Sequence, residues 1–156
     1  MAHIHRSGPV DQTYAPVKLT SSVPTNTINI GDLVAIESNK AVPAASFTWD
    51  TDLATTQTAF AAAFLGLSAS RSRASTTDSR DLEIAVDMDG NVEFDCVSGS
   101  YTIGQYIGCA KDTGNNLKQT VTGVASKTLA IAVVVKDSGA NATRVTARLL
   151  NTPVKR

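Results

Sequence analysis

Apolar and polar residues alternate most regularly in two neighbouring stretches of the chain. Residues 82–87 place three apolar side chains on one face, and residues 92–96 do the same. Between them lies Asp89-Gly90, and an Asp-Gly pair supplies the positive φ angles of a tight turn. We therefore predict that the two stretches form a β-hairpin.

Shorter β-rich stretches separated by turn residues continue through the chain. Residues 27–36 and 100–110 share one order: β-forming residues, then Ile-Gly and a polar residue, then apolar residues. This repeated order of residues predicts two similar strand-turn-strand units. Further strands are expected at residues 121–124, 129–135 and 144–149, the second of them buried on both faces.

One segment has helical character. Leu53, Phe60 and Phe64 share a single face at helical spacing, and alanines fill the positions between them. Asp50 is a candidate N-cap. We predict one α-helix over about residues 51–64, inserted into a mainly β fold, either an antiparallel β-barrel or a β-sandwich.

The predicted organisation is an extended N-terminal arm, residues 1–25, followed by a single β-rich domain, residues 26–152. The arm contains three prolines and little periodicity, which suits an extended segment. Residues 68–81 are polar and aperiodic, so we expect an exposed loop there. A length of 156 residues agrees with one domain.

Charge and hydropathy exclude several classes of protein. The formal net charge is zero, whereas nucleic-acid binders are usually strongly basic. No stretch approaches the ~18 apolar residues of a membrane helix, so we expect no membrane partner. The first residues lack the apolar core of a secretory signal, so we expect a product of the cytoplasm. Cys96 and Cys109 lie in strand-like contexts and are expected to be buried free thiols, with a single disulfide as the alternative.

The neutral total conceals a separation of charge along the chain. Residues 1–77 contain five acids and five bases, residues 78–95 seven acids and one base, and residues 96–156 two acids and eight bases. Two interpretations are open. The acidic and basic strands pair within one subunit, or an acidic face of one subunit meets a basic face of another.

Little in the sequence could support catalysis. His3 and His5 are the only histidines, and both lie in the predicted arm, where two ligands at this spacing do not make a zinc site. Residues 87–91 resemble the start of a calcium loop, but glycine falls at the fourth position instead of the sixth, and hairpin-turn chemistry explains the same residues. We therefore expect no enzyme and no cofactor. The candidate interaction residues are His3, His5, Arg6, Tyr14, Trp49, Asp87, Asp89, Glu93, Arg144 and Arg148.

Several short motifs follow one another in an order that resembles a known family. They are Ile-Gly-Asp-Leu-Val at 30–34, Phe-Leu-Gly-Leu at 64–67 after the helix, Gly-Asn-Val-Glu-Phe at 90–94, Thr-Ile-Gly-Gln-Tyr-Ile-Gly at 102–108, the strand 131–135 and Val-Thr-Ala-Arg-Leu at 145–149. This pattern resembles the capsid decoration (cement, head-stabilising) proteins of tailed bacteriophages. In the second Ile-Gly unit, Gln105-Tyr106 replaces the Asp-Leu of the first.

The resemblance implies a β-barrel or tulip-like domain, commonly a homotrimer, that stabilises a capsid and carries no catalysis. Its partner would be the major capsid protein, and its location the exterior of the virion, after synthesis in the host cytoplasm. The predicted arm would bind the lattice, and the barrel would contact other copies. The alternative is a carbohydrate- or surface-binding β-module of a fibre or adhesin, for which Trp49, Tyr14, Tyr101 and Tyr106 are the only Trp and Tyr residues.

Overall fold

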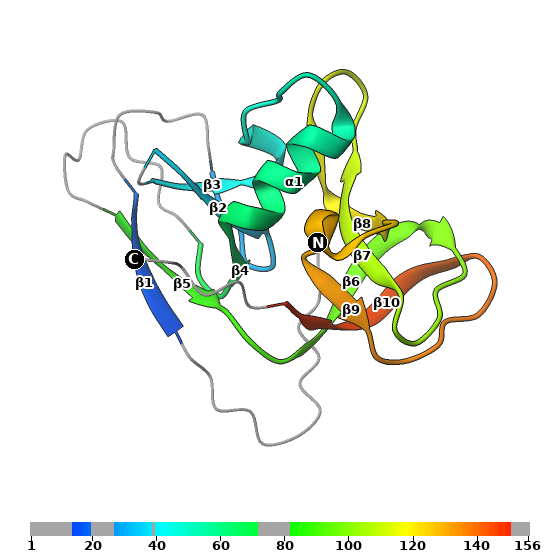
Figure 1. Cartoon of the computed structure of the whole chain (residues 1–156). Coiled ribbons are helices and arrows are strands. Elements are labelled where there is room, and N and C mark those ends of the chain that lie inside the picture. Colours follow the sequence, from blue (N-terminus) through cyan, green and yellow to red (C-terminus); the bar gives the residue numbers. More distant parts are fainter. Residues whose placement is uncertain (1–13, 20–26, 39, 72–81, 151–156) are drawn as a thin grey trace.

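A computed structural model describes residues 14–19, 27–38, 40–71 and 82–150. In these ranges the fold is mainly β and contains one α-helix, as predicted. The ten strands found there form two groups, an open five-stranded sheet and a closed five-stranded barrel (Figure 1).

The open sheet is formed by strands between residues 14 and 87. Its strands lie in the order β1-β5-β4-β2-β3, and every neighbouring pair is antiparallel. We call strands β1 to β5 the N-terminal unit. They span Tyr14–Leu19 (β1), Leu33–Glu37 (β2), Lys40–Pro43 (β3), Phe64–Ser68 (β4) and Leu82–Asp87 (β5).

The closed barrel comes from the second half and has the order β10-β6-β8-β7-β9. The predicted barrel is therefore confirmed, with one difference: β6 and β8 are parallel, joined at Cys96 and Val121. We call strands β6 to β10 the C-terminal unit. They span Asn91–Gly99 (β6), Tyr106–Lys111 (β7), Leu117–Gly123 (β8), Ala132–Val134 (β9) and Ala142–Leu149 (β10).

The two units repeat one arrangement of strands. In each unit the second strand pairs with the third and fourth, the fourth with the fifth, and the fifth with the first. The first and third strands meet through the parallel pair β6–β8 in the C-terminal unit, and β1 and β3 come close in the N-terminal unit. The prediction of two similar units is thus confirmed and extends to five strands of each, but the residues directly before each Ile-Gly turn, 27–28 and 100–101, were expected to be strands and are not.

A four-residue turn, the Ile-Gly turn, precedes the second strand of each unit at residues 29–32 and 102–105. Gly31 and Gly104 have φ angles of 87° and 85°, a region that side chains with a Cβ avoid. In both turns the fourth residue's N–H donates to the first residue's carbonyl, and its side chain accepts the first residue's N–H. Each glycine N–H then donates to the last residue of the fourth strand, Ser68 or Val134.

The predicted hairpin between residues 82–87 and 92–96 is wrong. Both stretches are strands, but β5 pairs with β1 and β4, whereas β6 pairs with β10 and β8. Gly90 has a φ of 113°, so the Asp-Gly pair does make a turn. This turn carries the chain from one unit to the other instead of folding two strands together.

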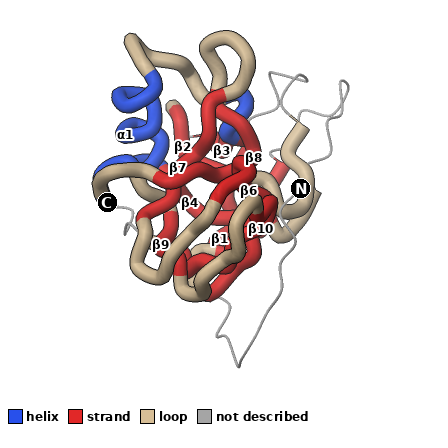
Figure 2. Tube along the Cα trace, turned by 90° about the vertical axis from the view of Figure 1, so that its right-hand side faces the viewer, coloured by secondary structure: helices blue, strands red, loops and turns tan. Residues whose placement is uncertain are grey.

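Helix α1, Leu53–Ala63, forms where it was predicted but begins two residues later. Asp52, not Asp50, is the N-cap, since its Oδ1 accepts the Thr55 N–H at 2.7 Å. This hydrogen bond lowers the pKa of the Asp52 carboxyl. The helix lies on the outside of the strands, beside β2 and β7 (Figure 2). It thereby covers the junction of the two units.

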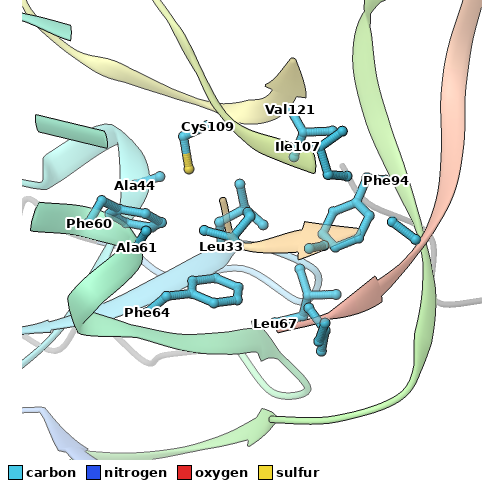
Figure 3. Packing of buried hydrophobic residues seen from close by; sticks show 14 of the residues in the cluster. Leu33, Ala44, Phe60, Ala61, Phe64, Leu67, Phe94, Ile107, Cys109 and Val121 are labelled. Carbon is cyan, nitrogen blue, oxygen red and sulfur yellow. The ribbon is translucent and has the colours of Figure 1, made fainter. Parts of the chain in front are cut away.

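Two groups of buried side chains hold the fold together. The larger contains residues of α1, of the barrel interior and of one face of β2 and β4, among them Phe60, Phe94, Leu33 and Leu67 (Figure 3). The smaller lies within the N-terminal unit and consists of Ile28, Val34, Ala41, Leu65 and Val86, with Ile36 and Met88 packed against it. Because the larger group draws on both units, they share one core.

Part of the predicted arm is a strand of the sheet. Tyr14–Leu19 is extended, as expected, and pairs along its whole length with β5. The rest of the predicted arm, residues 1–13 and 20–25, lies outside the described residues, as do residues 72–81 of the predicted loop. Between residues 129 and 135, Ala132 and Val134 are buried, but Val133 is half-exposed, which corrects the expectation of burial on both faces. None of the helices in the described part of the chain has the length and apolarity needed to cross a membrane.

Candidate functional site

Two strands of the barrel bring the acidic and basic segments of the chain together. Arg144 on β10 lies opposite Asp95 on β6, with its Nε 3.5 Å from Asp95 Oδ1 and its Nη1 3.6 Å from Glu93 Oε1. For these residues the intrachain interpretation of the charge pattern is therefore confirmed. The Arg144 side chain is half-exposed, and ion pairs in such positions contribute about 0–1 kcal/mol.

A shallow polar depression of about 300 Å³ lies beside this pair. Two of its residues support the loop before β10. Asp137 Oδ1 accepts the Ile103 N–H at 2.7 Å, and Ser138 Oγ accepts the Tyr101 N–H at 2.9 Å. The depression thus offers mixed charges for polar contacts. It is lined by Glu93, Lys136, Asp137, Ser138, Gly139, Ala142, Arg144 and Thr146, of which the sequence had singled out only Glu93 and Arg144.

The other two acidic candidates occupy different environments. Asp87, at the end of β5, is only 6% exposed, whereas Asp89 is exposed and accepts the Gly90 N–H on its Oδ1 at 2.7 Å. Among the described residues no three His, Cys, Asp or Glu side chains lie together as a metal would require. Asp89 therefore stabilises the turn between the units.

Trp49 is half-buried and packs against the larger core group. The Nζ of Lys111 lies 5.1 Å from the centre of its ring, a cation–π contact that joins the two units. Trp49 is one of the candidate interaction residues predicted from the sequence. The structure places it at the edge of the core, and Lys111 is a partner that sequence reasoning missed.

Both cysteines are free and buried, as predicted. They face the same residue of β8, Val121, from the strands on either side of it. Burial raises the pKa of Cys96 and, more strongly, that of Cys109. Because the thiolate is the reactive form, neither side chain is suited to act as a nucleophile.

The aromatic residues considered for glycan binding do not form a common platform in the described structure. Tyr101 is buried, its hydroxyl donates to the Val97 carbonyl at 2.6 Å, and burial raises its pKa to about 12. Tyr106 is half-buried on β7, whereas Trp49 lies in the loop between β3 and α1. Tyr14 lies opposite Asp87 in the sheet, and the position of its side chain is not described.

The remaining candidates do not converge on one site. Arg148 is exposed on β10, opposite Asn91. His3, His5 and Arg6 lie outside the described residues.

Two glutamine side chains that the sequence did not single out link the units. Gln119 Oε1 on β8 accepts the Leu33 N–H at 2.7 Å, and Gln57 Nε2 on α1 donates to the Cys109 carbonyl at 2.6 Å. Gln119 Nε2 is buried and has no hydrogen-bond partner within the described ranges. No local sequence signal predicts such contacts, because each joins residues more than fifty positions apart.

The two Ile-Gly turns expose the same residue. Ile30 is 56% exposed and Ile103 65%, the highest values among the large apolar side chains that the structure describes. Their fourth residues differ: Asp32 is buried, and desolvation raises the pKa of its carboxyl in spite of the hydrogen bond from Asn29, whereas Gln105 is neutral. The turns are therefore equivalent in geometry and in the apolar side chain that they present.

Comparisons with protein-family models, with curated proteins and with solved structures found no match for this chain.

Proposed function

We propose that this chain is a structural protein of a tailed-bacteriophage virion that binds the outer surface of the capsid lattice. It stabilises the shell by bridging capsid subunits, and its partner is the major capsid protein. The proposal begins from the resemblance of the motifs at residues 30–34, 64–67, 90–94 and 102–108 to capsid decoration proteins. In this proposal the chain is not an enzyme and acts by binding alone.

The observation that carries the proposal is the use of the polar and ionisable side chains in the described ranges. The carboxylates whose contacts are known pair with basic side chains or accept backbone N–H groups in turns and at the helix cap, as Asp95, Asp137 and Asp52 do. The thiols are buried with raised pKa values. What the chain offers to a partner is a surface with exposed apolar side chains, among them Ile30 and Ile103 at the two Ile-Gly turns.

A protein that binds only the assembled lattice stabilises it by mass action, because its binding free energy is lost when the lattice comes apart. The closed barrel of the C-terminal unit has no free strand edges that could pair with other chains, which suits the part of an external protein that faces solvent.

Binding to purified shells tests the proposal directly. Shells that lack the protein are incubated with the full chain, sedimented and examined by electron microscopy. We expect saturable occupancy at repeated positions of the outer surface and a higher temperature of shell disruption. Absence of binding to shells of the phage that encodes the chain would contradict the proposal.

A truncation tests the part assigned to the arm. Removal of residues 2–20 would also remove β1, so a deletion of residues 2–13 is the sharper variant because it keeps β1 paired with β5. We expect this variant to remain folded and to lose occupancy of the shell. Unchanged occupancy would show that the β-rich domain, and not residues 2–13, contacts the lattice.

A further inference from the structure

The turn between the two units contains Asp89-Gly90, and its geometry places a carboxyl group beside a backbone nitrogen. Asp89 Oδ1 accepts the Gly90 N–H at 2.7 Å. The carboxyl carbon, Cγ, is bonded directly to this oxygen, so it also lies close to the Gly90 nitrogen. Reacting groups that are held together in this way react as if their local concentration were very high. The turn is therefore arranged for attack of the Gly90 nitrogen on the Asp89 side chain.

The residue that follows the aspartate decides how easily this attack proceeds. Gly90 has no Cβ to block the approach, and its φ of 113° lies in a region that glycine adopts readily. Two other aspartates make the same contact with the following residue. Asp50 accepts the Thr51 N–H at 2.7 Å, and Asp112 accepts the Thr113 N–H at 2.8 Å. Threonine is branched and stiff at Cβ, so these two sites share the contact but not the freedom of the glycine.

Other carboxylates of the described ranges accept N–H groups farther along the chain. Asp52 accepts the Thr55 N–H at the helix cap, and Asp137 accepts the Ile103 N–H at an Ile-Gly turn. Only the nitrogen of the next residue closes the small cyclic imide, succinimide. Asp89 is also exposed, so water can reach it. Contact, neighbour and exposure therefore combine favourably at Asp89.

We propose that Asp89 is a site of spontaneous modification, at which the native protein converts aspartate to isoaspartate. The Gly90 nitrogen loses its proton and forms a bond to Asp89 Cγ, while the bond from Cγ to one carboxyl oxygen breaks and a water molecule leaves. Another water molecule then opens the succinimide. Cleavage of the new N–Cγ bond restores aspartate, whereas cleavage of the original peptide C–N bond gives isoaspartate. The conversion therefore neither gains nor loses atoms and needs no oxidant or cofactor.

The modification falls on the peptide link between the two units. Strand β5 ends at Asp87 and β6 begins at Asn91, and Figure 1 shows the chain running here from the sheet to the barrel. In isoaspartate the backbone passes through the Asp89 side chain, which lengthens the link by one carbon atom. The Gly90 carbonyl accepts the Leu149 N–H of β10 at 3.0 Å. A longer link displaces Gly90 from this hydrogen bond, so the modification loosens the attachment of the turn to the barrel.

Peptide mapping of the stored protein tests the proposal, which does not depend on capsid binding. The native full chain is kept at neutral pH and physiological temperature for several weeks and is then digested. Chromatography with mass spectrometry separates isoaspartyl from aspartyl peptides, and an isoaspartyl methyltransferase labels the former. A synthetic peptide of residues 86–93, stored in parallel, shows when the reaction has had time to occur. We expect isoaspartate at residue 89 to exceed that at residues 50 and 112 at least ~10-fold, because threonine hinders the approach at those sites.

Two variants should change the yield in opposite directions. Asp89→Ser keeps an oxygen for the Gly90 N–H and removes the carboxyl group, so no succinimide forms there. Asp89→Asn presents a neutral amide, which is attacked more readily than a carboxylate and releases ammonia. It should react faster than the wild type and leave aspartate and isoaspartate in place of asparagine. Thermal melting of the fresh proteins checks that both variants are folded.

The stability of stored protein tests the consequence for the turn. Stored wild-type protein should melt at a lower temperature than fresh protein, and stored Asp89→Ser should not. If native protein contained no isoaspartate at residue 89 after the peptide had reacted, or equal amounts at residues 50, 89 and 112, the proposal would be overturned. Equal losses of stability in wild type and Asp89→Ser, or no loss in modified wild type, would overturn the effect assigned to the turn.

Discussion

The N-terminal and C-terminal units have the same strand order, yet only the second closes into a barrel. Closure requires the first and third strands to overlap. In the C-terminal unit these strands have nine and seven residues, whereas in the N-terminal unit they have six and four. Pro16 and Pro43, which lack the N–H that a ladder needs, lie in the two short strands. One topology thus gives a sheet or a barrel according to strand length and proline placement.

The two units also differ in the charged residues that face each other where the first strand pairs with the fifth. Lys18 lies opposite Glu83 in the N-terminal unit, and Asp95 lies opposite Arg144 at the matching position of the C-terminal unit. The signs of the two pairs are reversed between units. The separation of acids and bases along the chain therefore places opposite charges across one strand pair in each half of the fold.

The largest expected difference between the units concerns the outer face of their second and fourth strands. Leu33→Ala or Leu67→Ala should lower the free energy of unfolding by about 2–5 kcal/mol, because each removes fully buried methyl groups. Val133→Ala, at the position that matches Leu67, should cost about 1 kcal/mol or less. Urea denaturation of each variant and of the wild type measures each difference. Equal costs at matched positions would show that the burial of the two faces does not differ.

The Ile-Gly turns should instead respond alike. Gly31→Ala and Gly104→Ala each place a Cβ at a positive φ, so each should lower the free energy of unfolding by about 1–2 kcal/mol. Gly139→Ala is the control, because no atom lies within 4 Å of the added Cβ and its φ is not positive. Thermal denaturation of the three variants makes the comparison. A loss in only one of the two turns would contradict their equivalence.

The smallest expected effect concerns the fourth residues of the two Ile-Gly turns, Asp32 and Gln105. Burial raises the pKa of Asp32 above 3.8, so the folded protein binds this proton more tightly than the unfolded chain does. Its contribution to stability is therefore largest at low pH and falls as pH rises from about 3.8 through the folded pKa. Asp32→Asn keeps an oxygen for the Asn29 N–H and removes this dependence. We expect the difference in unfolding free energy between variant and wild type to grow in favour of the variant across that window.

Gln105→Glu provides the reciprocal control. It places a carboxyl at the matching position of the C-terminal unit, where Gln105 accepts the Thr102 N–H. Stability measured by urea denaturation at several pH values should then show a dependence that the wild-type turn lacks. If Asp32→Asn leaves the pH dependence unchanged, the burial of Asp32 is not its source.

Local sequence patterns predicted the elements of this fold better than their pairing. The alternation at residues 82–87 and 92–96 correctly predicted two strands, and Asp89-Gly90 a turn. The hairpin was wrong because a turn signal does not specify whether the flanking strands pair with each other or with strands from elsewhere in the chain. The helix was predicted to within two residues because its apolar spacing is a local signal, although its N-cap is Asp52 and not the predicted Asp50.

The residues of the candidate site likewise include some that the sequence predicted and others that it missed. Glu93 and Arg144 were singled out from the distribution of charge, and the structure brings them together. Lys136 and Ser138 of the adjoining depression were missed, since their place depends on the loop that leads into β10. Gln57 and Gln119 were missed because their partners are 52 and 86 residues away.

The sequence by itself determined the strands at residues 82–87, 91–99 and 142–149, the single helix, the two Ile-Gly turns and the repeat that relates residues 27–36 to residues 100–110, but not strands β1, β3 and β4. These follow from local preferences, in which a glycine at positive φ or an apolar residue at every second position needs no distant partner. Tertiary structure alone decided that the repeat includes five strands per unit, that only one unit closes, and that Leu33 is buried while Tyr106 is not. Those outcomes depend on which surfaces of each unit are covered by the helix or by the other unit. This coverage is established only when the whole chain packs together.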